Sequence, residues 1–264
     1  MRVSISRVEK NGKVTLQESG GIAIVTIYRP AFKNALTAKM WREMRLVAEK
    51  IPTHARTKVV LLRGAGGLFT AGSDIKEFHR LTLEEADEAF HLMEQAISAF
   101  EKLELPTIGV INGPAMGAGL ELALACDLRI GTSNTKMGMP IGRLGITLSK
   151  KFTKRIVDII GPSRTKDLVY TGRILGPHES QEWGLINYLL SDDQGPDHFA
   201  AQLANQIKQQ SGASLRAVKE AIAYSQPLLD IPVKSEFKSN VDPEDFPEGV
   251  RAFVEKRKPR FGKE

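Results

Sequence analysis

Residues 106–131, PTIGVINGPAMGAGLELALACDLRIG, decide the fold class of this chain. Residues 106–113 form an apolar run typical of a buried strand, 117–125 have the character of a short helix, and 126–132 are again strand-like. Uninterrupted apolar strands are typical of parallel sheets that helices cover on both faces. This stretch therefore predicts a strand–helix–strand unit of an α/β protein.

The sequence on either side extends this pattern. Toward the N-terminus, strands are expected at 13–19, 21–30 and 57–64, and helices at 37–51 and 82–105. Thr37 is a suitable N-cap for the first of these helices. Beyond residue 150, helices are expected at 149–161, 163–172, 177–184, 197–210 and 213–226, with one short strand at 185–190. We therefore predict a mostly parallel α/β core followed by a largely helical C-terminal third.

The composition is that of a soluble globular protein with a sizeable core. The chain has 264 residues, 42% hydrophobic and 26% charged, which fits one large domain or one domain with an appendage. Its single cysteine, Cys126, cannot form an internal disulfide, and its apolar neighbours favour a buried thiol in a reducing compartment. No apolar run is long enough to cross a bilayer, and the N-terminus lacks the apolar core of a secretory signal. We expect a cytoplasmic protein without a membrane partner, with a very short mitochondrial presequence as the alternative.

The charge balance is positive. The formal net charge is +6, and residues 255–264, EKRKPRFGKE, form a basic run. Such a balance could attract nucleic acid or an anionic ligand, and the alternative is a tail that is simply solvated. The five histidines show no spacing typical of a metal site, so no metal is expected.

A second glycine-rich stretch, RGAGGLFTAGSDIKEF at residues 63–78, directly follows a predicted buried strand. It lacks the lysine of the Walker pattern and the glycine spacing of the dinucleotide fingerprint, so neither phosphate site is expected. Gly72 would let the N–H of Ser73 point outward as the chain enters a helix at Asp74. The alternative is a tight turn in which Asp74 only caps the helix.

The quoted stretch has the same layout. Gly117, Ala118 and Gly119 follow a strand and would place free backbone N–H groups at a helix N-terminus. Ala118 and Glu121 lie three residues apart and so share one face of that helix. Apolar neighbours should desolvate Glu121 and raise its pKa, which makes it a better proton acceptor and donor near neutrality. The alternative is a structural glutamate that turns to solvent or pairs with an arginine such as Arg129.

Three segments together resemble a known family. RPAFKNALT (29–37), GAGGLFTAGSDIKEF (64–78) and VINGPAMGAGLELALACDLRI (110–130) resemble the signatures of the enoyl-CoA hydratase/isomerase (crotonase) family in order and separation, and 161–187 and 245–261 resemble its later segments. The resemblance implies a crotonase-like spiral of strand–strand–helix repeats over residues 1–195, which holds an acyl-CoA site. It implies a helical region over residues 196–264 for trimerisation and active-site closure. It also implies a homotrimer or a dimer of trimers, with coenzyme A as part of the substrate and no separate cofactor.

The resemblance further implies roles for individual residues. The backbone N–H groups of Ser73 and Ala118 would form an oxyanion hole that holds the thioester carbonyl as it becomes an enolate. Glu121 falls on the first catalytic glutamate of the hydratases. The Ala71 carbonyl would meet the adenine, and Lys33 would meet the phosphates of CoA. The full set of implied substrate contacts is Lys33, Ala35, Leu36, Ala71, Gly72, Asp74, Ile75, Gly117 and Ile141.

Ile141 departs from the family pattern. Hydratases carry a second catalytic glutamate directly after a proline, in a segment similar to MGMPIGRLG at 137–145, and residues 148–152, LSKKF, stand where they have a glycine-rich turn. Gly145 and Arg155 keep the surrounding register. Addition of water to an enoyl thioester usually uses two groups, one that orients the water and one that delivers a proton to C2. The side chain of isoleucine can do neither.

Three readings of the function are open. The first is a hydratase-like enzyme in which Glu121 works without the second carboxylate. The second keeps the fold but makes the chain an isomerase or a decarboxylase, reactions that need only one carboxylate or none. The third and minor reading is a non-catalytic or RNA-binding relative, motivated by the positive charge; nucleic acid is not the partner we expect.

Overall fold

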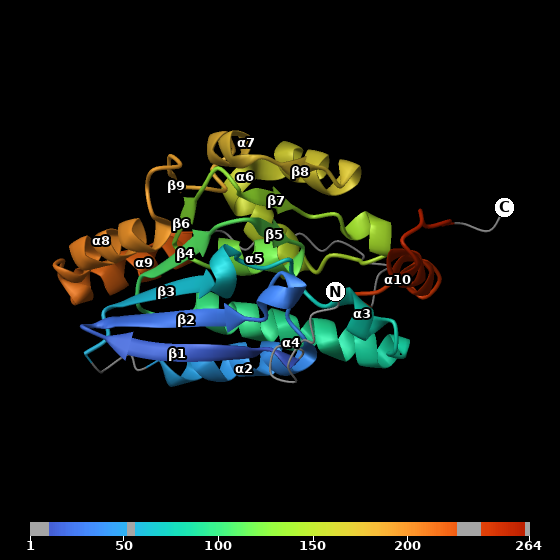
Figure 1. Cartoon of the computed structure of the whole chain (residues 1–264), viewed down its shortest axis with the longest axis horizontal. Coiled ribbons are helices and arrows are strands. Elements are labelled where there is room, and N and C mark those ends of the chain that lie inside the picture. Colours follow the sequence, from blue (N-terminus) through green and yellow to red (C-terminus); the bar gives the residue numbers. More distant parts are fainter. Residues whose placement is uncertain (1–10, 52–55, 226–238, 262–264) are drawn as a thin grey trace, which may run out of the picture.

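A six-stranded sheet forms the centre of the computed structural model, which describes residues 11–51, 56–225 and 239–261 (Figure 1). Its strands, in spatial order, are β1 (Lys13–Ser19), β2 (Ile22–Tyr28), β3 (Val59–Gly64), β4 (Thr107–Ile111), β6 (Leu128–Gly131) and β9 (Tyr188–Leu189). β1 and β2 form an antiparallel hairpin, and the other neighbouring strands pair in parallel. The predicted, mostly parallel α/β core is confirmed.

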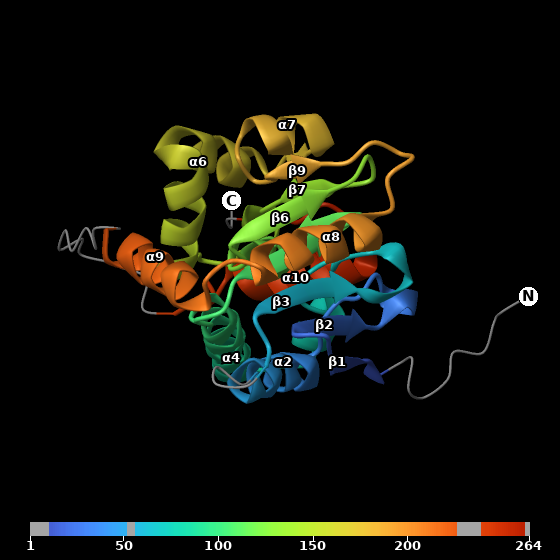
Figure 2. The ribbon, with the colours of Figure 1, turned by 90° about the vertical axis from the view of Figure 1, so that its left-hand side faces the viewer.

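Helices cover both faces of this sheet. α2 (Ala38–Lys50) and α4 (Leu83–Glu101) lie on one face, where alternate residues of β2 are buried in the main core. α8 (Pro196–Lys208) lies on the other face, and its Ala200 and Ala204 pack against apolar residues of β3, β4 and β6. Figure 2 shows α8 lying across the sheet on the side opposite α2 and α4. Residues 196–208 are therefore packed on the core sheet, whereas the division of the chain at residue 195 stays a prediction.

Helices α2 and α4 begin at side-chain caps, of which the first was predicted from the sequence. Thr37 accepts a hydrogen bond from the N–H of Met40 at 3.2 Å, which confirms it as the N-cap of α2. Thr82 and Glu85 form a reciprocal capping box at the start of α4. These caps fix where the helices begin, and thus which of their residues face the core.

A smaller sheet continues the chain beyond the main one. β5 (Pro114–Met116), β7 (Lys136–Gly138) and β8 (Ile174–Leu175) form it, in the order β5-β7-β8. β5 follows β4 closely and leads into α5 (Ala118–Leu124), so β4-β5-α5 is one strand–strand–helix turn of the expected spiral. Strands of two or three residues carry no readable periodicity, and for that reason the sequence analysis did not predict this sheet.

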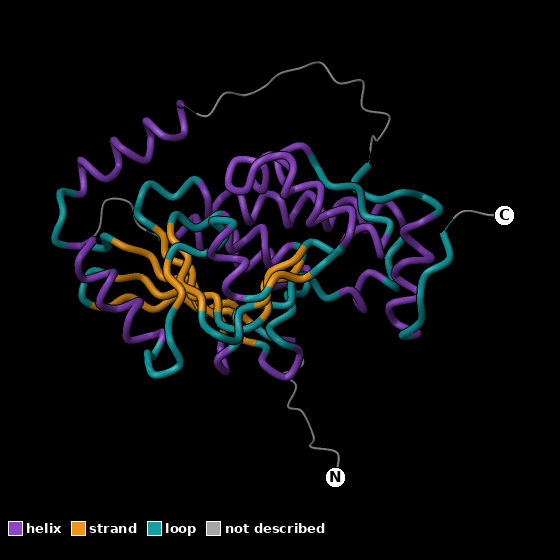
Figure 3. Tube along the Cα trace, turned by 90° about the horizontal axis from the view of Figure 1, so that it is seen from above, coloured by secondary structure: helices purple, strands orange, loops and turns teal. Residues whose placement is uncertain are grey.

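The remaining helices are α3 (Ile75–Phe78), α6 (Lys150–Thr171), α7 (Pro177–Glu182), α9 (Gly212–Ser225) and α10 (Asp245–Glu255), with short 3-10 turns η1 (Pro30–Phe32), η2 (Ala65–Gly67) and η3 (Ile141–Leu144). α6 breaks at Gly161, where φ is +77°, as expected from two helical segments on either side of that glycine. α9 projects from the body (Figure 3) and exposes Val218 and Ile222. α10, which the sequence analysis did not predict, packs closely on η3: a Cβ on Gly249 would lie 2.6 Å from the Leu144 carbonyl carbon.

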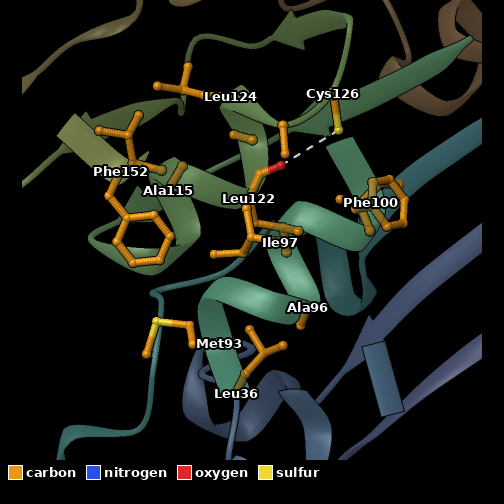
Figure 4. Close-up of a cluster of buried hydrophobic side chains, with 14 of the residues drawn as sticks. Leu36, Met93, Ala96, Ile97, Phe100, Ala115, Leu122, Leu124, Cys126 and Phe152 are labelled. Carbon is orange, nitrogen blue, oxygen red and sulfur yellow. Dashed lines mark hydrogen bonds between the residues drawn. The ribbon is translucent and has the colours of Figure 1, made fainter. Parts of the chain in front are cut away.

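The core beneath the smaller sheet joins α4, α5 and α6 (Figure 4). Met93 and Ile97 of α4 lie near Leu122 of α5 and Phe152 of α6 in one buried cluster. Cys126 is part of it; its Sγ lies 3.7 Å from the Leu122 carbonyl oxygen, and burial raises its pKa to about 12. The predicted buried, structural thiol is confirmed. In the described part of the chain no helix is long and apolar enough to cross a membrane.

Candidate active site

The two glycine-rich turns lie against each other. Thr70, in the loop after β3, donates its N–H to the Pro114 carbonyl at 3.0 Å, and Thr70 and Ala115 form a parallel bridge. Ser73 lies three positions after Thr70, and Ala118 lies three positions after Ala115. Two regions 45 positions apart in the sequence therefore meet at the N-terminus of α5.

Glycine makes this contact possible. At Gly72 φ is +92°, and a Cβ there would lie 2.3 Å from the Met116 carbonyl oxygen. A Cβ on Gly119 would lie 2.8 Å from the Thr70 carbonyl oxygen and 3.1 Å from the Gly72 nitrogen. Neither position has room for a side chain, so the two backbones fix each other's position.

Ser73 and Ala118 each present a backbone N–H that has no hydrogen-bond partner in the described part of the chain. Both neighbours of the Ser73 N–H along the backbone are engaged, because Gly72 accepts from the Leu36 N–H at 2.8 Å and Asp74 donates to the Leu36 carbonyl at 2.9 Å. Ala118 is the first residue of α5, so its N–H has no acceptor within the helix. Two donors on adjoining turns are thus left available.

The Ser73 side chain points away from this pair of donors into the core. Its Oγ accepts a hydrogen bond from Trp41 Nε1 at 3.0 Å and lies 3.7 Å from Met93 Sδ. The turn is therefore anchored to α2 and α4 through the side chain, and its main chain carries the free donor.

Glu121 lies one helical turn beyond Ala118 on α5 and is fully buried. Its Oε2 accepts a hydrogen bond from Arg155 Nη1 at 2.7 Å, whereas Oε1 is buried without a partner in the described residues. Burial raises the pKa of Glu121 to about 8, and the positive charge of Arg155 opposes this shift. The direction predicted from the apolar neighbours is confirmed.

Arg155, on α6, joins Glu121 to a third residue. Its Nε and Nη2 donate to the two carboxylate oxygens of Glu101, at the end of α4, at 2.9 and 2.8 Å. The sequence analysis named Arg129 as the alternative partner of Glu121, and this was wrong: Arg129 donates to the carbonyl oxygens of Leu185 and Cys126.

Sequence reasoning used Arg155 only to align the register and missed both it and Glu101 as neighbours of the site. The pattern of apolar residues along α6 could have identified Arg155 as a buried charge. Arg155 falls on the buried face of α6, together with Phe152 and Ile156. A charged side chain on such a face requires a buried partner of opposite sign.

The residues implied as coenzyme A contacts flank the Ser73 turn. The Lys33 carbonyl accepts from the Ala71 N–H at 2.9 Å, and the bonds of Leu36 with Gly72 and Asp74 extend this pairing. The structure therefore brings 33–36 and 71–74 together, with Lys33 exposed, Ala35 half-buried and Leu36 buried.

Asp74 is already engaged by protein groups. Its side chain caps α3 by accepting from the Lys76 N–H and pairs with Arg29 Nη1 at 2.8 Å. The capping role weighed from the sequence is confirmed, and Ile75 is the first residue of α3.

The other two implied contacts lie at the starts of short helical elements. Gly117 precedes α5 with φ +53° and donates its N–H to the Gly138 carbonyl at 2.9 Å. Ile141 begins η3 directly after Pro140 and is buried. In the described part of the chain, no group of three or more His, Cys, Asp or Glu side chains could hold a metal ion.

Comparison with known proteins decides the family. A family model described as enoyl-CoA hydratase/isomerase matches residues 17–264. The chain belongs to this family. As an enoyl-CoA hydratase/isomerase family member, it is similar to the short-chain-enoyl-CoA hydratase of Clostridium acetobutylicum, with 33% identity over 251 residues that cover 93% of this chain and 95% of the relative.

Solved structures of family members share the fold. One is an enoyl-CoA hydratase/carnithine racemase from Magnetospirillum magneticum, with 33% identity, a TM-score of 0.76, and coverage of 95% of this chain and 96% of that one. Another is an enoyl-CoA hydratase from Mycobacterium avium subsp. paratuberculosis K-10, with 25% identity, a TM-score of 0.82, and coverage of 95% and 98%. The crotonase-like fold is confirmed, and the chain is an enzyme of the hydratase/isomerase type.

Proposed function

We propose that this family member is an enoyl-CoA hydratase-like enzyme in which the N–H groups of Ser73 and Ala118 bind the thioester carbonyl oxygen. The observation that carries the proposal is the pair of unpartnered N–H donors on two adjoining turns, one helical turn from a buried carboxylate. Fixed donors of this kind stabilise an oxyanion as it develops, each typically by about 3–4 kcal/mol.

Glu121 supplies the proton transfer. Its free oxygen accepts a proton from water while the water oxygen bonds to C3 of the enoyl group, and the π electrons move onto the thioester oxygen as an enolate. The enolate then collapses as Glu121 returns the proton to C2, which leaves a 3-hydroxyacyl thioester and the original carboxylate. A carboxyl group whose pKa lies near 8 is suited to both steps near neutral pH.

Coenzyme A would lie along the paired segments 33–36 and 71–74. In this proposal the Ala71 carbonyl contacts the adenine, the exposed Lys33 contacts the phosphates, and Ala35, Leu36, Asp74 and Ile75 contact the pantetheine arm. The assignment is supported by the backbone pairing that holds these residues beside Ser73. The half-buried Asp74 contributes through its backbone, because Arg29 and the α3 cap occupy its carboxylate.

The test is hydration of crotonyl-CoA, followed as loss of the enoyl absorbance. The named relative acts on short-chain enoyl-CoA, which makes crotonyl-CoA the first substrate to use. Glu121→Gln should reduce turnover about a thousand-fold or more while the Kd for butyryl-CoA stays within a factor of a few. Lys154→Gln, on an exposed residue paired with Asp158, is the matched control and should leave turnover unchanged. Full activity of the Glu121→Gln protein would exclude the catalytic role of Glu121.

A second candidate, an isomerase or a decarboxylase, is favoured by one observation. Ile141 is buried and apolar at the position that holds the second glutamate in hydratases. Loss of CO2 from a malonyl-type thioester leaves its bonding electrons on C2 as an enolate, and a single proton donor completes that reaction. A panel of 3-enoyl and malonyl-type thioesters, with product analysis, separates this candidate from hydration: turnover of these without hydration of crotonyl-CoA would favour it.

We further propose a homotrimer or a dimer of trimers. The projecting helix α9, with Val218 57% and Ile222 55% exposed, supports an assembly in which this face is covered. Sedimentation of the purified protein tests this, and a monomer at micromolar concentration would contradict it.

A further inference from the structure

Arg155 has a position that the proposed reaction does not use directly. It is 5% exposed in its side chain, and it bonds to one carboxylate that is fully buried and to another, Glu101, that is 44% exposed. We propose that Arg155 is a positioning residue, held by Glu101, that fixes Oε2 of Glu121 and thereby makes Oε1 the oxygen that exchanges the proton. This inference rests on the proposed function only for the identity of the reaction.

The two oxygens of Glu121 are not equivalent in this structure. Oε2 is held at 2.7 Å by a charged donor, whereas Oε1 is buried with no partner among the described residues. A charge-assisted hydrogen bond of this length restricts rotation of the carboxyl group. The proton therefore exchanges at the oxygen whose lone pairs are free, and Arg155 decides which oxygen that is.

Glu101 holds the guanidinium in its orientation. Its two oxygens accept from Nε and Nη2 of Arg155, the paired geometry in which a planar guanidinium is least free to turn. The remaining bonded nitrogen, Nη1, is thereby directed at Glu121. Lysine at this position would keep the charge but lose this planar, three-point arrangement.

The charges around Glu121 act in opposite directions. Arg155 of α6 lowers the pKa of Glu121, while Glu101 and Glu94 of α4 raise it, in addition to the dominant effect of burial. Glu94 is itself paired with Lys151 of α6 at 3.2 Å. Neutralising Arg155 should therefore make Glu121 harder to ionise, and neutralising Glu101 should make it easier.

This opposition can be tested by titration, which shows whether Arg155 and Glu101 act on the Glu121 carboxyl group as the geometry predicts. The protein is labelled with ¹³C at the glutamate side-chain carboxyl and titrated by NMR, and the spectrum of Glu121→Gln assigns the Glu121 signal. We expect Arg155→Gln to move the Glu121 midpoint upward by about one pH unit and Glu101→Gln to move it downward by about half a unit. Lys154→Gln, which removes an exposed pair on the same helix, should not move it.

Shifts in the same direction, or no shift, in the two variants would overturn the proposal. If Arg155→Gln does not fold, the sign of the Glu101→Gln shift decides alone, since an upward or absent shift contradicts the proposal. The titration needs no substrate, so it tests the role of Arg155 even if the wild-type protein does not hydrate crotonyl-CoA. Absence of hydration would count against the proposed function only.

Where turnover is present, kinetics add a second readout. Arg155→Lys should lower kcat about ten-fold and leave the KM for crotonyl-CoA unchanged, because Arg155 orients Glu121 without binding the thioester. A raised KM with unchanged kcat would instead show that Arg155 contributes to substrate binding, and would overturn the positioning role.

Discussion

Two glutamate–arginine pairs in this molecule have similar hydrogen-bond lengths, but the pKa values of their glutamates are shifted in opposite directions. Glu121 is bonded to Arg155 at 2.7 Å inside the core, and Glu248 of α10 is bonded to Arg257 at 2.6 and 2.9 Å near the surface. Burial raises the pKa of Glu121 to about 8, whereas hydrogen bonds, from Arg257 above all, lower the pKa of Glu248 to about 2. The comparison teaches that a bound arginine does not by itself keep a carboxylate charged.

The difference comes from the solvent around each pair and from which carboxylate receives the paired bonds of the arginine: Arg155 gives them to Glu101, whereas Arg257 gives them to Glu248. Both arginines also bind a second carboxylate, Glu101 for Arg155 and Glu255 for Arg257. At the surface, water solvates the charges that remain unpaired, so the hydrogen bonds decide the pKa of Glu248. In the core no water compensates, so desolvation outweighs the attraction of Arg155. A perturbed carboxyl group beside unpartnered donors is a site candidate, whereas the surface pair is structural.

The largest expected difference between the pairs is in stability. Arg155→Met leaves Glu121 buried with neither oxygen hydrogen-bonded, and should lower the free energy of unfolding by about 3 kcal/mol. Arg257→Met removes a solvated pair and should lower the free energy of unfolding by much less. Urea unfolding of both variants checks this, and equal destabilisation would show that burial does not distinguish the two pairs.

The pH dependence of stability should differ in sign. The folded-state pKa of Glu121 lies above its ordinary value of 4.5, so the folded protein keeps a proton that the unfolded chain releases, and its contribution to stability falls as pH rises from about 4.5 through about 8. The pKa of Glu248 is lowered, so its contribution is lost as pH falls from about 4.5 through about 2. Unfolding curves across pH should lose the first slope in Glu121→Gln and the second in Glu248→Gln, and a slope unchanged by its own substitution would refute that assignment.

The smallest expected difference between the two pairs is the response of their glutamate pKa values to salt. One molar NaCl shortens the Debye length to about 3 Å and should move the pKa of Glu248 upward toward its ordinary value, since that pair is in contact with solvent. The midpoint of Glu121 should move much less because its own side chain and that of Arg155 are buried away from ions. The ¹³C titration described above, repeated in high salt, measures both groups in one sample, and a larger shift at Glu121 would mean that water reaches it.

Much of this fold could be predicted from periodicity. The strands β1 and β2 show a two-residue repeat, β3 and β4 are continuous apolar runs, and the helices α2, α4 and α8 show a helical repeat. The smaller sheet could not be predicted, because β5, β7 and β8 are too short to show a period. Helix α10 was also not predicted, although its Phe246 and Val250 are buried and Phe246 packs against Phe78 and Phe90, residues far from it in the sequence.

The candidate site, like the fold, could be predicted only in part. Glu121 and the two glycine turns stand out in the sequence because each breaks a local pattern, a charge in an apolar helix and glycines after buried strands. The partners of Glu121 do not stand out, because Arg155 and Glu101 lie 34 and 54 positions from their contacts along the chain. Only the tertiary packing of α5 against both α4 and α6 brings them together, and the choice of Arg129 shows how proximity in sequence misleads.

The bond between Trp41 and Ser73 has a practical consequence. Trp41 is one of two tryptophans in the chain, it is 2% exposed, and its indole N–H is bonded to the residue whose main chain carries a candidate donor. The other, Trp183, lies at the end of α7 between Arg164 and Arg173. With Trp183 replaced by phenylalanine, the protein contains a single tryptophan, which is bonded to the Ser73 turn, so tryptophan emission excited at about 295 nm can follow ligand arrival in real time without any added dye.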